Sequence, residues 1–563
     1  MKTVLFHSNS SKAFTGFGKN AKNILRYLYK TKKYKIVEFA NGATWDHPAL
    51  QNRPWETQGT LPSNPAILEQ LQHNPEAQRD ASYGGMTIDQ AISKYKPDVY
   101  IGVEDIWGFN GYWKRKWWNK TNCMIWTTLD SLPILPTAIE AAPDIKNYYV
   151  WASFAEKEMH KLGHKNVKTL PGALDTSTFF RLSDDDRVRL RAQNNLSNEF
   201  IIGFVFRNQL RKSVPNLLDG FQIFKKENPE SKAKLLLHTH WSEGWDIPRL
   251  LKEKNINPND ILTTYVCKDC KNYEVKPFVG ESQDCKFCGS KKSVNTTNIS
   301  CGVDESQLNE VYNLMDVYCH PFTSGGMEIP IFEAKLTELP TLVTNYSCGE
   351  DSCTPESGGF ELDWAEYREP GTQFIKASTS ANSIARQLKK VYKLKKDKLK
   401  LIGSKAREFT IKNYSIESVG KRLEKIIDDM PDVNWDFKFE DDGQKLKSLE
   451  DLLDPGDRIA IVIPQSDTDV LFINSMIDNL KSLYPKHDIY MFVDDKFTSY
   501  ADDHPSVHKV LPYKPELDNL LFLEGRFEHK GYFDCAFVPH VGTQKFHNYQ
   551  HNGKDKTQFK LYT

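Results

Sequence analysis

Short apolar runs that resemble β-strands alternate with amphipathic helical segments along most of this chain. In the first third, the strand-like runs cover residues 4–6, 34–39, 99–103, 124–127 and 148–152. The segment 21–28 between the first two runs has apolar side chains at the i, i+3, i+4, i+7 spacing of a helix face. Strands that alternate with helices through short connections form parallel, doubly wound sheets. The sequence therefore predicts an α/β fold.

The alternation restarts twice, and a chain of 563 residues is too long for one hydrophobic core. The predicted domains are 1–172 and 173–430, both Rossmann-like, an acidic linker at 431–457, and an accessory α/β domain at 458–563. Ser153 and Glu156 have the spacing of a capping box at the start of one helix. The segment 41–85 is polar and contains prolines, so we expect an irregular loop with acceptor contacts.

Two C-x2-C pairs interrupt the second Rossmann-like domain, in an insert at about 265–298. The pairs are Cys267 with Cys270 and Cys285 with Cys288. Four thiolates at this spacing are typical of a tetrahedral zinc site. Because four sulfurs leave no open coordination position, we expect structural zinc and no catalytic metal. Lysines around the pairs leave open a second role in docking to nucleic acid or protein.

The charge balance and apolar content exclude several classes of protein. The chain has 74 Lys plus Arg and 74 Asp plus Glu, so no strongly basic field for nucleic acid covers the whole protein. No apolar run approaches the roughly 20 residues of a membrane span. The start of the chain lacks the apolar stretch of a signal peptide. We therefore expect a cytoplasmic protein without a membrane span.

Five segments, in order along the chain, carry a family resemblance. They are Gly16-Phe17-Gly18 after the first strand, residues 170–179, Arg207 with Lys212, residues 320–334, and residues 340–345. Over residues 1–428 the chain resembles family-4 glycosyltransferases, which have the GT-B fold of two Rossmann-like domains around a cleft. The resemblance implies a retaining enzyme that moves a sugar from a nucleotide diphosphate to an acceptor hydroxyl.

The resemblance also implies roles for individual residues. Arg207 and Lys212 would stabilise the leaving diphosphate, because fixed cations do so without reorganising. Glu333 matches the glutamate that accepts hydrogen bonds from the ribose hydroxyls. At Gly16, Gly18, Gly325 and Gly326 the backbone would approach the donor closely, since glycine has no Cβ.

The chain departs from the family pattern at two places. The first glutamate of the family's pair should fall eight residues before Glu333, where this chain has Gly325. Glu328 lies nearby and either contacts the donor sugar from a shifted position or is an acid at a helix N-terminus. The first domain also lacks the histidine that many members place near the acceptor, and Asp130 or Glu104 is the alternative there.

The acceptor and the C-terminal domain leave alternatives open. A carbohydrate acceptor is one, and a nucleic-acid base, as in modified phage-type DNA, is another. Trp113 and Trp117 flank a basic run that is either a stacking platform or an amphipathic helix with a buried face. His238 and His240 at a strand end either contact phosphate or are simple edge residues.

Residues from 459 onward resemble the N-terminal half of family-9 heptosyltransferases, which implies an accessory domain.

A non-catalytic function is the alternative to the enzyme. A degenerate transferase whose zinc insert and C-terminal domain bind nucleic acid or protein would also account for the missing glutamate and histidine. The presence of Arg207, Lys212 and Glu333 together favours the enzyme.

Overall fold

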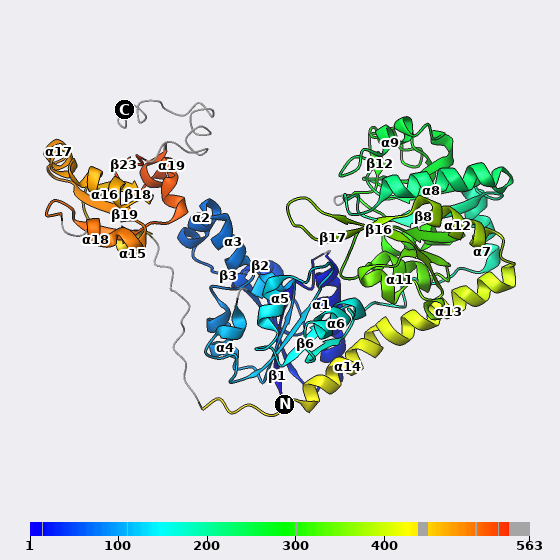
Figure 1. Cartoon of the computed structure of the whole chain (residues 1–563), viewed down its shortest axis with the longest axis horizontal. Helices are drawn as coiled ribbons and strands as arrows, with labels where there is room; N and C mark the ends of the chain where they lie inside the picture. Colours follow the sequence, from blue (N-terminus) through cyan, green and yellow to red (C-terminus); the bar gives the residue numbers. More distant parts are fainter. Residues whose placement is uncertain are drawn as a thin grey trace. The chain divides into compact units, whose positions relative to one another are not determined.

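The computed structural model forms two compact units (Figure 1). The larger comprises residues 1–42, 47–58 and 91–440, and the smaller comprises 43–46, 59–90 and 441–563. The structure describes residues 1–539 except Phe14, Asn110, 299–300, 437–448, Gln465, 502–503 and 527–528. Residues 437–448 of the predicted linker and 540–563 of the predicted accessory domain therefore lie outside the described residues.

The larger unit begins with a sheet in the strand order β3-β2-β1-β4-β5-β6-β7. Its strands are β1 (Thr3–Asn9), β2 (Lys35–Thr44), β3 (Glu56–Leu61), β4 (Val99–Val103), β5 (Asn122–Thr127), β6 (Asn147–Val150) and β7 (Val167–Thr169). The pairings from β2 through β1 to β7 are parallel. The connecting helices are α1 (Gly16–Thr31), α4 (Ile88–Tyr95), α5 (Pro136–Ala141) and α6 (Ser153–Lys161). We call this sheet with its helices the first lobe.

The second sheet of the larger unit has the order β11-β10-β9-β8-β13-β14-β15, with β12 also paired to β10. Its strands are β8 (Phe200–Val205), β9 (Ala233–His238), β10 (Ile261–Cys267), β11 (Tyr273–Pro277), β12 (Val294–Thr296), β13 (Val317–His320), β14 (Thr341–Thr344) and β15 (Gly359–Leu362). The strands from β10 to β15 pair in parallel, whereas β11 and β12 are antiparallel to β10. The cysteine insert thus extends this sheet at one edge.

Helices on the second sheet and a hairpin complete what we call the second lobe. They are α7 (Asp184–Gln193), α8 (Val214–Glu227), α9 (Ile247–Glu253), α10 (Glu305–Asn313), α11 (Ile329–Leu336), α12 (Ala381–Tyr392), α13 (Lys396–Tyr414) and the hairpin β16 (Trp364–Arg368) with β17 (Ile375–Thr379). Buried apolar side chains from 200–206, 214–224 and 233–237 form its core. These are the positions that the alternating pattern assigns to the sheet and to one helix face. The prediction of two parallel Rossmann-like sheets is confirmed.

The last helix of the predicted second domain packs in the first lobe. Helices α13 and α14 (Ile416–Asp429) are drawn in yellow in Figure 1. Val419 and Leu423 of α14 share a hydrophobic core with Ile24 of α1. The Lys33 ammonium donates to Glu424 of the same helix. The first lobe therefore consists of two stretches of chain, and the boundary at residue 430 does not separate the lobes.

The smaller unit contains a parallel sheet in the order β20-β19-β18-β23. Its strands are β18 (Arg458–Ile463), β19 (Asp488–Val493), β20 (Lys509–Pro512) and β23 (Cys535–Phe537), beside the short pair β21 (Gly525–Arg526) and β22 (His529–Lys530). Its helices are α15 (Leu449–Leu452), α16 (Asp467–Asn474), α17 (Ile477–Leu483), α18 (Thr498–Ala501) and α19 (Leu520–Glu524). Leu449 and Leu453 pack in its core, although they fall within the predicted linker.

The predicted irregular loop 41–85 is largely regular and belongs in part to this smaller unit. It forms β3, α2 (Pro65–His73) and α3 (Pro75–Ser82). The rings of His73 and Phe522 lie 5.3 Å apart, and Asn519 Nδ2 lies 3.2 Å from His73 Nδ1. The expectation of an irregular loop is therefore wrong, because prolines here begin helices at N1, where the missing N–H costs nothing.

The aromatic run at 113–118 is buried. Trp113 is 7% exposed and Trp117 1% exposed, so these rings pack in the first lobe and are not a stacking platform. The local structure is a short 3-10 turn, η3 (Tyr112–Lys114), rather than the amphipathic α-helix that the spacing suggested.

Candidate functional site

A cleft lies at the carboxyl ends of β8 and β9, opposite the start of α1. It encloses about 1300 Å³ of empty space, part of it open to solvent. The second sheet reverses its strand order between β8 and β13, and such a switch point is where open α/β sheets bind ligands. The predicted site residues that line the cleft are Gly16, Arg207, Lys212, Glu328 and Glu333. Lys19, Arg211, His238 and His240 line it too.

Two cations in this cleft share one carboxylate. The Lys212 ammonium pairs with Oε2 of Glu328, and the Arg211 guanidinium pairs with Oε1. The side chains of Lys212 and Glu328 are each 4% exposed, whereas that of Arg211 is 43% exposed. Burial opposes the ionisation of Glu328, but the charges of Lys212 and Arg211 outweigh it and hold the pKa of Glu328 well below its usual value. The carboxylate is therefore charged at neutral pH.

His320 completes the surroundings of Glu328. Burial lowers the pKa of His320 to about 4, so its imidazole is neutral. Its Nε2 lies 3.1 Å from Oε2 of Glu328, and its Nδ1 lies 2.9 Å from the Tyr318 hydroxyl. Since a carboxylate only accepts hydrogen bonds, Nε2 carries the proton. The sequence predicted neither this histidine nor Arg211 as a partner of Glu328.

Glu328 occupies the space that a side chain at position 325 would need. A Cβ at Gly325 would lie 2.6 Å from Oε1 of Glu328. The glycine at the position of the family's first glutamate therefore makes room for the carboxylate that enters from three residues later. At Gly326, a Cβ would lie 2.4 Å from Cβ of Thr128 in the first lobe. Both glycines allow close packing, and neither is among the residues that line the cleft.

Arg207 is the more exposed of the two predicted cations. Its side chain is 56% exposed, and Nε and Nη2 donate to Oε1 of Glu243 over 2.8 and 2.6 Å. The pair sits in solvent at the cleft wall, where such an ion pair contributes little to stability. Arg207 can therefore exchange Glu243 for another anion at small cost.

Glu333 is buried in α11 at the opposite wall of the cleft. Its Oε2 accepts a hydrogen bond of 2.8 Å from the Tyr312 hydroxyl. Burial raises the pKa of Glu333, although the charge of Lys19 and the Tyr312 hydrogen bond oppose the rise. Among the described residues no side chain bonds to Oε1 of Glu333, so this oxygen can accept from a ligand hydroxyl.

The glycines of the first loop differ in their surroundings. Gly16 lines the cleft, whereas Gly18 is buried at the start of α1. A Cβ on Gly18 would lie 2.4 Å from the Ala13 carbonyl oxygen, so glycine is needed there for the turn into the helix. The backbone N–H of Gly18 donates to Oγ1 of Thr15 over 3.0 Å. Gly18 thus shapes the loop and does not face the cleft.

The acceptor-side candidates lie at the carboxyl ends of β4 and β5. Asp130 is exposed and is not among the cleft-lining residues. Glu104 is 3% exposed and accepts a hydrogen bond of 3.1 Å from Asn41. Burial and the neighbouring charge of Asp105 raise the pKa of Glu104 to about 7. Glu104 is thus partly protonated near neutral pH.

A further cation that the sequence did not indicate lies close to this edge. Lys376 on β17 is 9% exposed, and its ammonium donates to Oγ of Ser131 over 2.8 Å and to Oγ of Ser324 over 2.7 Å. It thereby joins the loop before Gly325 to the loop after Asp130. No local motif surrounds Lys376, so only packing reveals it.

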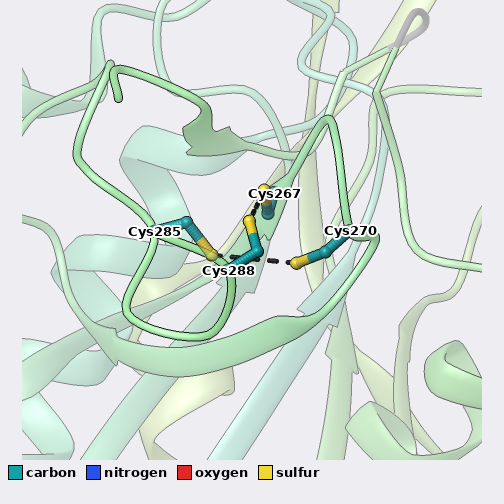
Figure 2. Close-up of side chains that lie close together, drawn as sticks. All are labelled: Cys267, Cys270, Cys285 and Cys288. Atoms are coloured by element: carbon teal, nitrogen blue, oxygen red, sulfur yellow. Dashed lines mark hydrogen bonds between the residues drawn. The ribbon is translucent and has the colours of Figure 1, made fainter. Parts of the chain in front are cut away.

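The four cysteines of the insert converge (Figure 2). Their Sγ atoms all lie within 4.8 Å of one another, with Cys267 and Cys288 3.8 Å apart and Cys270 and Cys285 3.7 Å apart. A tetrahedron with Zn–S bonds of about 2.3 Å has edges of about 3.8 Å. The donor set therefore fits a four-thiolate metal site. Among the described residues, His238 and His240 form no such cluster.

No protein-family model matches the chain, and no curated protein matches its sequence. Solved structures do match. A glycosyltransferase from Rickettsia africae has a TM-score of 0.52 at 15% identity, over 76% of this chain and 98% of that chain. Sucrose-phosphate synthase from Thermosynechococcus elongatus has a TM-score of 0.52 at 14% identity, over the same shares.

The chain has the GT-B fold. A third similar structure, HepE from Anabaena in complex with UDP, has a TM-score of 0.51 at 12% identity, over 76% of this chain and all of that one. Because the identities are low, these likenesses establish the architecture and not the reaction. In the described part of the chain, no helix is long and apolar enough to cross a membrane.

Proposed function

We propose that this protein is a retaining glycosyltransferase that moves a sugar from a nucleotide diphosphate to an acceptor hydroxyl. The observation that carries the proposal is the convergence of Arg207, Lys212 and Glu333, far apart in the chain, on one cleft of a GT-B fold. HepE, a protein of the same fold, is solved with UDP. Retention of configuration is an inference from the family-4 resemblance.

The leaving diphosphate would bind at the cationic wall of the cleft. Lys212 is fixed by burial, and Arg207 can exchange Glu243 for a phosphate oxygen. Fixed cations stabilise the charge that develops on the diphosphate as the glycosidic bond breaks. Glu333 would accept hydrogen bonds from the ribose hydroxyls. In this scheme Glu328 keeps Lys212 and Arg211 in place and presents its carboxylate edge to the donor sugar.

The acceptor would enter from the first lobe. Asp130 stays the predicted contact for the acceptor hydroxyl, and Glu104 is the second candidate because its pKa lies near neutrality. A carbohydrate is the proposed acceptor, with a nucleic-acid base as the alternative. Zinc in the four-cysteine insert would be structural, and no catalytic metal is needed, because protein cations face the diphosphate.

One observation favours the alternative of a non-catalytic scaffold. Lys212 and Arg211 both pair with Glu328, and Arg207 pairs with Glu243, so each of these three cations already has a carboxylate partner. In such a protein the cleft would bind no nucleotide. The insert and the C-terminal domain would carry the function instead.

A thermal-shift panel with UDP-, GDP- and ADP-sugars separates the two functions. A ligand at about 100 times its Kd stabilises the folded state by about 2.7 kcal/mol, which corresponds to a rise in Tm of roughly 3 °C for a unit of this size. We expect one nucleotide to produce this shift and Glu333→Ala to abolish it. No shift with any donor would support the scaffold.

Nucleotide affinity should decrease above about pH 8. Burial lowers the pKa of Lys212 to about 8, although Glu328 opposes the decrease. Below this pH the ammonium is present and binds the diphosphate, and above it the neutral amine does not, so affinity falls by up to about tenfold per pH unit. Isothermal titration calorimetry from about pH 6.5 to about pH 9.5 measures the effect. Lys212→Arg keeps its charge and should flatten the profile. A wild-type Kd that stays constant across this range would contradict the assignment.

A further inference from the structure

The four-cysteine insert is connected to the candidate cleft by β12 and the segment that follows it. Cys267 ends β10 and lies opposite Val294 in the antiparallel pairing of β10 with β12. The Lys268 N–H donates to the Ser293 carbonyl over 2.9 Å, and the Thr296 N–H donates to Glu281 of the insert over 2.7 Å. The insert therefore contacts β12 at both of its ends.

The residues just beyond β12 line the cleft. Thr297, Asn298, Gly302 and Val303 are among its lining residues, together with Arg207 and Glu333. Their position depends on β12, because the chain leaves that strand at Thr296. A segment that is fixed by the insert thus forms part of the cleft wall.

Helix α10 makes a second connection. The Gln307 side-chain amide donates to the Lys271 carbonyl over 2.9 Å, and Lys271 directly follows a cysteine ligand. The Tyr273 hydroxyl donates to Glu310 over 2.5 Å. On the same helix, Tyr312 holds the Glu333 carboxylate through a hydrogen bond of 2.8 Å. Helix α10 therefore contacts both the insert and Glu333, the residue proposed to bind the ribose.

Strand β11 of the insert packs on the second lobe through Val275, but the part that carries the cysteines has little apolar packing of its own. Its own buried cluster consists of Tyr265, Cys267, Cys285 and Val294. Half of that cluster is cysteine, and a core of this size is too small to order about 30 residues alone. In small sites of this kind, metal-binding free energy supplies the folding free energy.

We propose that the metal-bound insert positions the donor cleft: by fixing β12 and α10 it places the cleft-lining residues just beyond β12 and Glu333 for nucleotide binding. This inference rests on the proposed function for its ligand. The metal would supply only the cross-link between the two C-x2-C pairs. Loss of metal should then weaken nucleotide binding although no cysteine ligand contacts the nucleotide.

The test compares full-length wild type with Cys288→Ser, which removes one ligand. Phe287→Ala is the matched control, because Phe287 lies between Cys285 and Cys288, is 52% exposed and offers no metal ligand. Zinc content, Kd for nucleoside diphosphates by calorimetry, and hydrogen exchange of peptides covering 294–313 are measured for each protein. In Cys288→Ser we expect zinc to be lost, exchange of 294–313 to accelerate, and Kd to rise roughly threefold to thirtyfold. Exchange in β8 and β14 should stay at the wild-type rate, and Phe287→Ala should match wild type throughout.

Tyr273→Phe separates positioning from folding, because it removes one contact to α10 and keeps all four thiolates. We expect wild-type zinc content and a Kd raised about fivefold, as for the loss of one hydrogen bond. This variant decides the matter if Cys288→Ser unfolds the whole second lobe. A wild-type Kd and wild-type exchange in a zinc-free protein would overturn the inference. If wild type binds no nucleotide, the proposed function fails, and the exchange of 294–313 with and without zinc still decides whether the metal orders the cleft wall.

Discussion

The substitution K212M should lower the rate of sugar transfer by about a hundredfold to a thousandfold, the usual effect of removing one preorganised donor from a developing charge. Methionine keeps most of the volume of the lysine side chain and removes its charge. Lys212 is 4% exposed and pairs with Glu328, so the substitution also leaves a buried carboxylate with Arg211 and the neutral His320 as its remaining partners. We expect a loss of about 1–3 kcal/mol in the free energy of unfolding, less than for a fully uncompensated buried charge, because Arg211 still pairs with Glu328.

The double variant K212M/E328Q separates stability from catalysis. Neutralising Glu328 removes the buried charge that has lost its lysine partner, so most of the lost stability should return. The transfer rate should stay low, because the diphosphate still lacks its ammonium. Urea denaturation and a coupled assay for released nucleoside diphosphate measure the two quantities. Recovery of the transfer rate in the double variant would show that Lys212 acts only by balancing Glu328.

The substitution E333Q should raise the Kd for the nucleotide by roughly 10- to 150-fold. A hydrogen bond to a charged group contributes about 1.5–3 kcal/mol, and glutamine keeps the shape of the side chain while losing its charge. Glu333 lies in the buried wall of the cleft, so solvent screens this contribution little. Calorimetry with nucleoside diphosphates gives the Kd directly.

A 2′-deoxynucleotide makes this test specific for the ribose. Wild type should bind the deoxynucleotide more weakly than the ribonucleotide, and E333Q should bind the two with similar affinity. Tyr312→Phe is the matched control, because it removes only the hydroxyl that donates to Glu333 over 2.8 Å. We expect a few-fold change at most and preserved discrimination between the two sugars. Equal discrimination in wild type and E333Q would place the ribose elsewhere.

The fold followed from the sequence because its signals are local. Apolar runs such as 200–206 and 233–237 are the buried strands β8 and β9, and the helical periodicity at 21–28 is the buried face of α1. The capping box expected at Ser153 and Glu156 was wrong. Ser153 instead donates from its N–H to Asp351 over 2.9 Å, and Glu156 accepts from Thr169 over 2.8 Å. Hydrogen bonds to residues distant in sequence replace the capping box, and the spacing of residues along the chain does not reveal such bonds.

The candidate site was predictable in part. The family resemblance singled out Arg207, Lys212 and Glu333, with Glu328 close to the position of the missing glutamate, and all four line the cleft. Their roles in binding and catalysis stay predictions. The pairing of Glu328 with Lys212 joins residues 116 apart in the chain. His320 lies within a quoted segment and Arg211 adjoins Lys212, but the resemblance does not indicate their contacts with Glu328, and Lys376 lies in no motif. Such contacts depend on how loops from different strands meet.

The sequence by itself determined the α/β class and the four-cysteine set, because hydrophobic periodicity and C-x2-C spacing act over a few residues. Only the tertiary structure decided three further features. These are that α14 packs in the first lobe, that segment 59–90 belongs to the C-terminal unit, and that Lys212 and Arg211 share the carboxylate of Glu328. Each depends on contacts between segments distant in sequence, whose free energy comes from burial and charge pairing in the assembled fold.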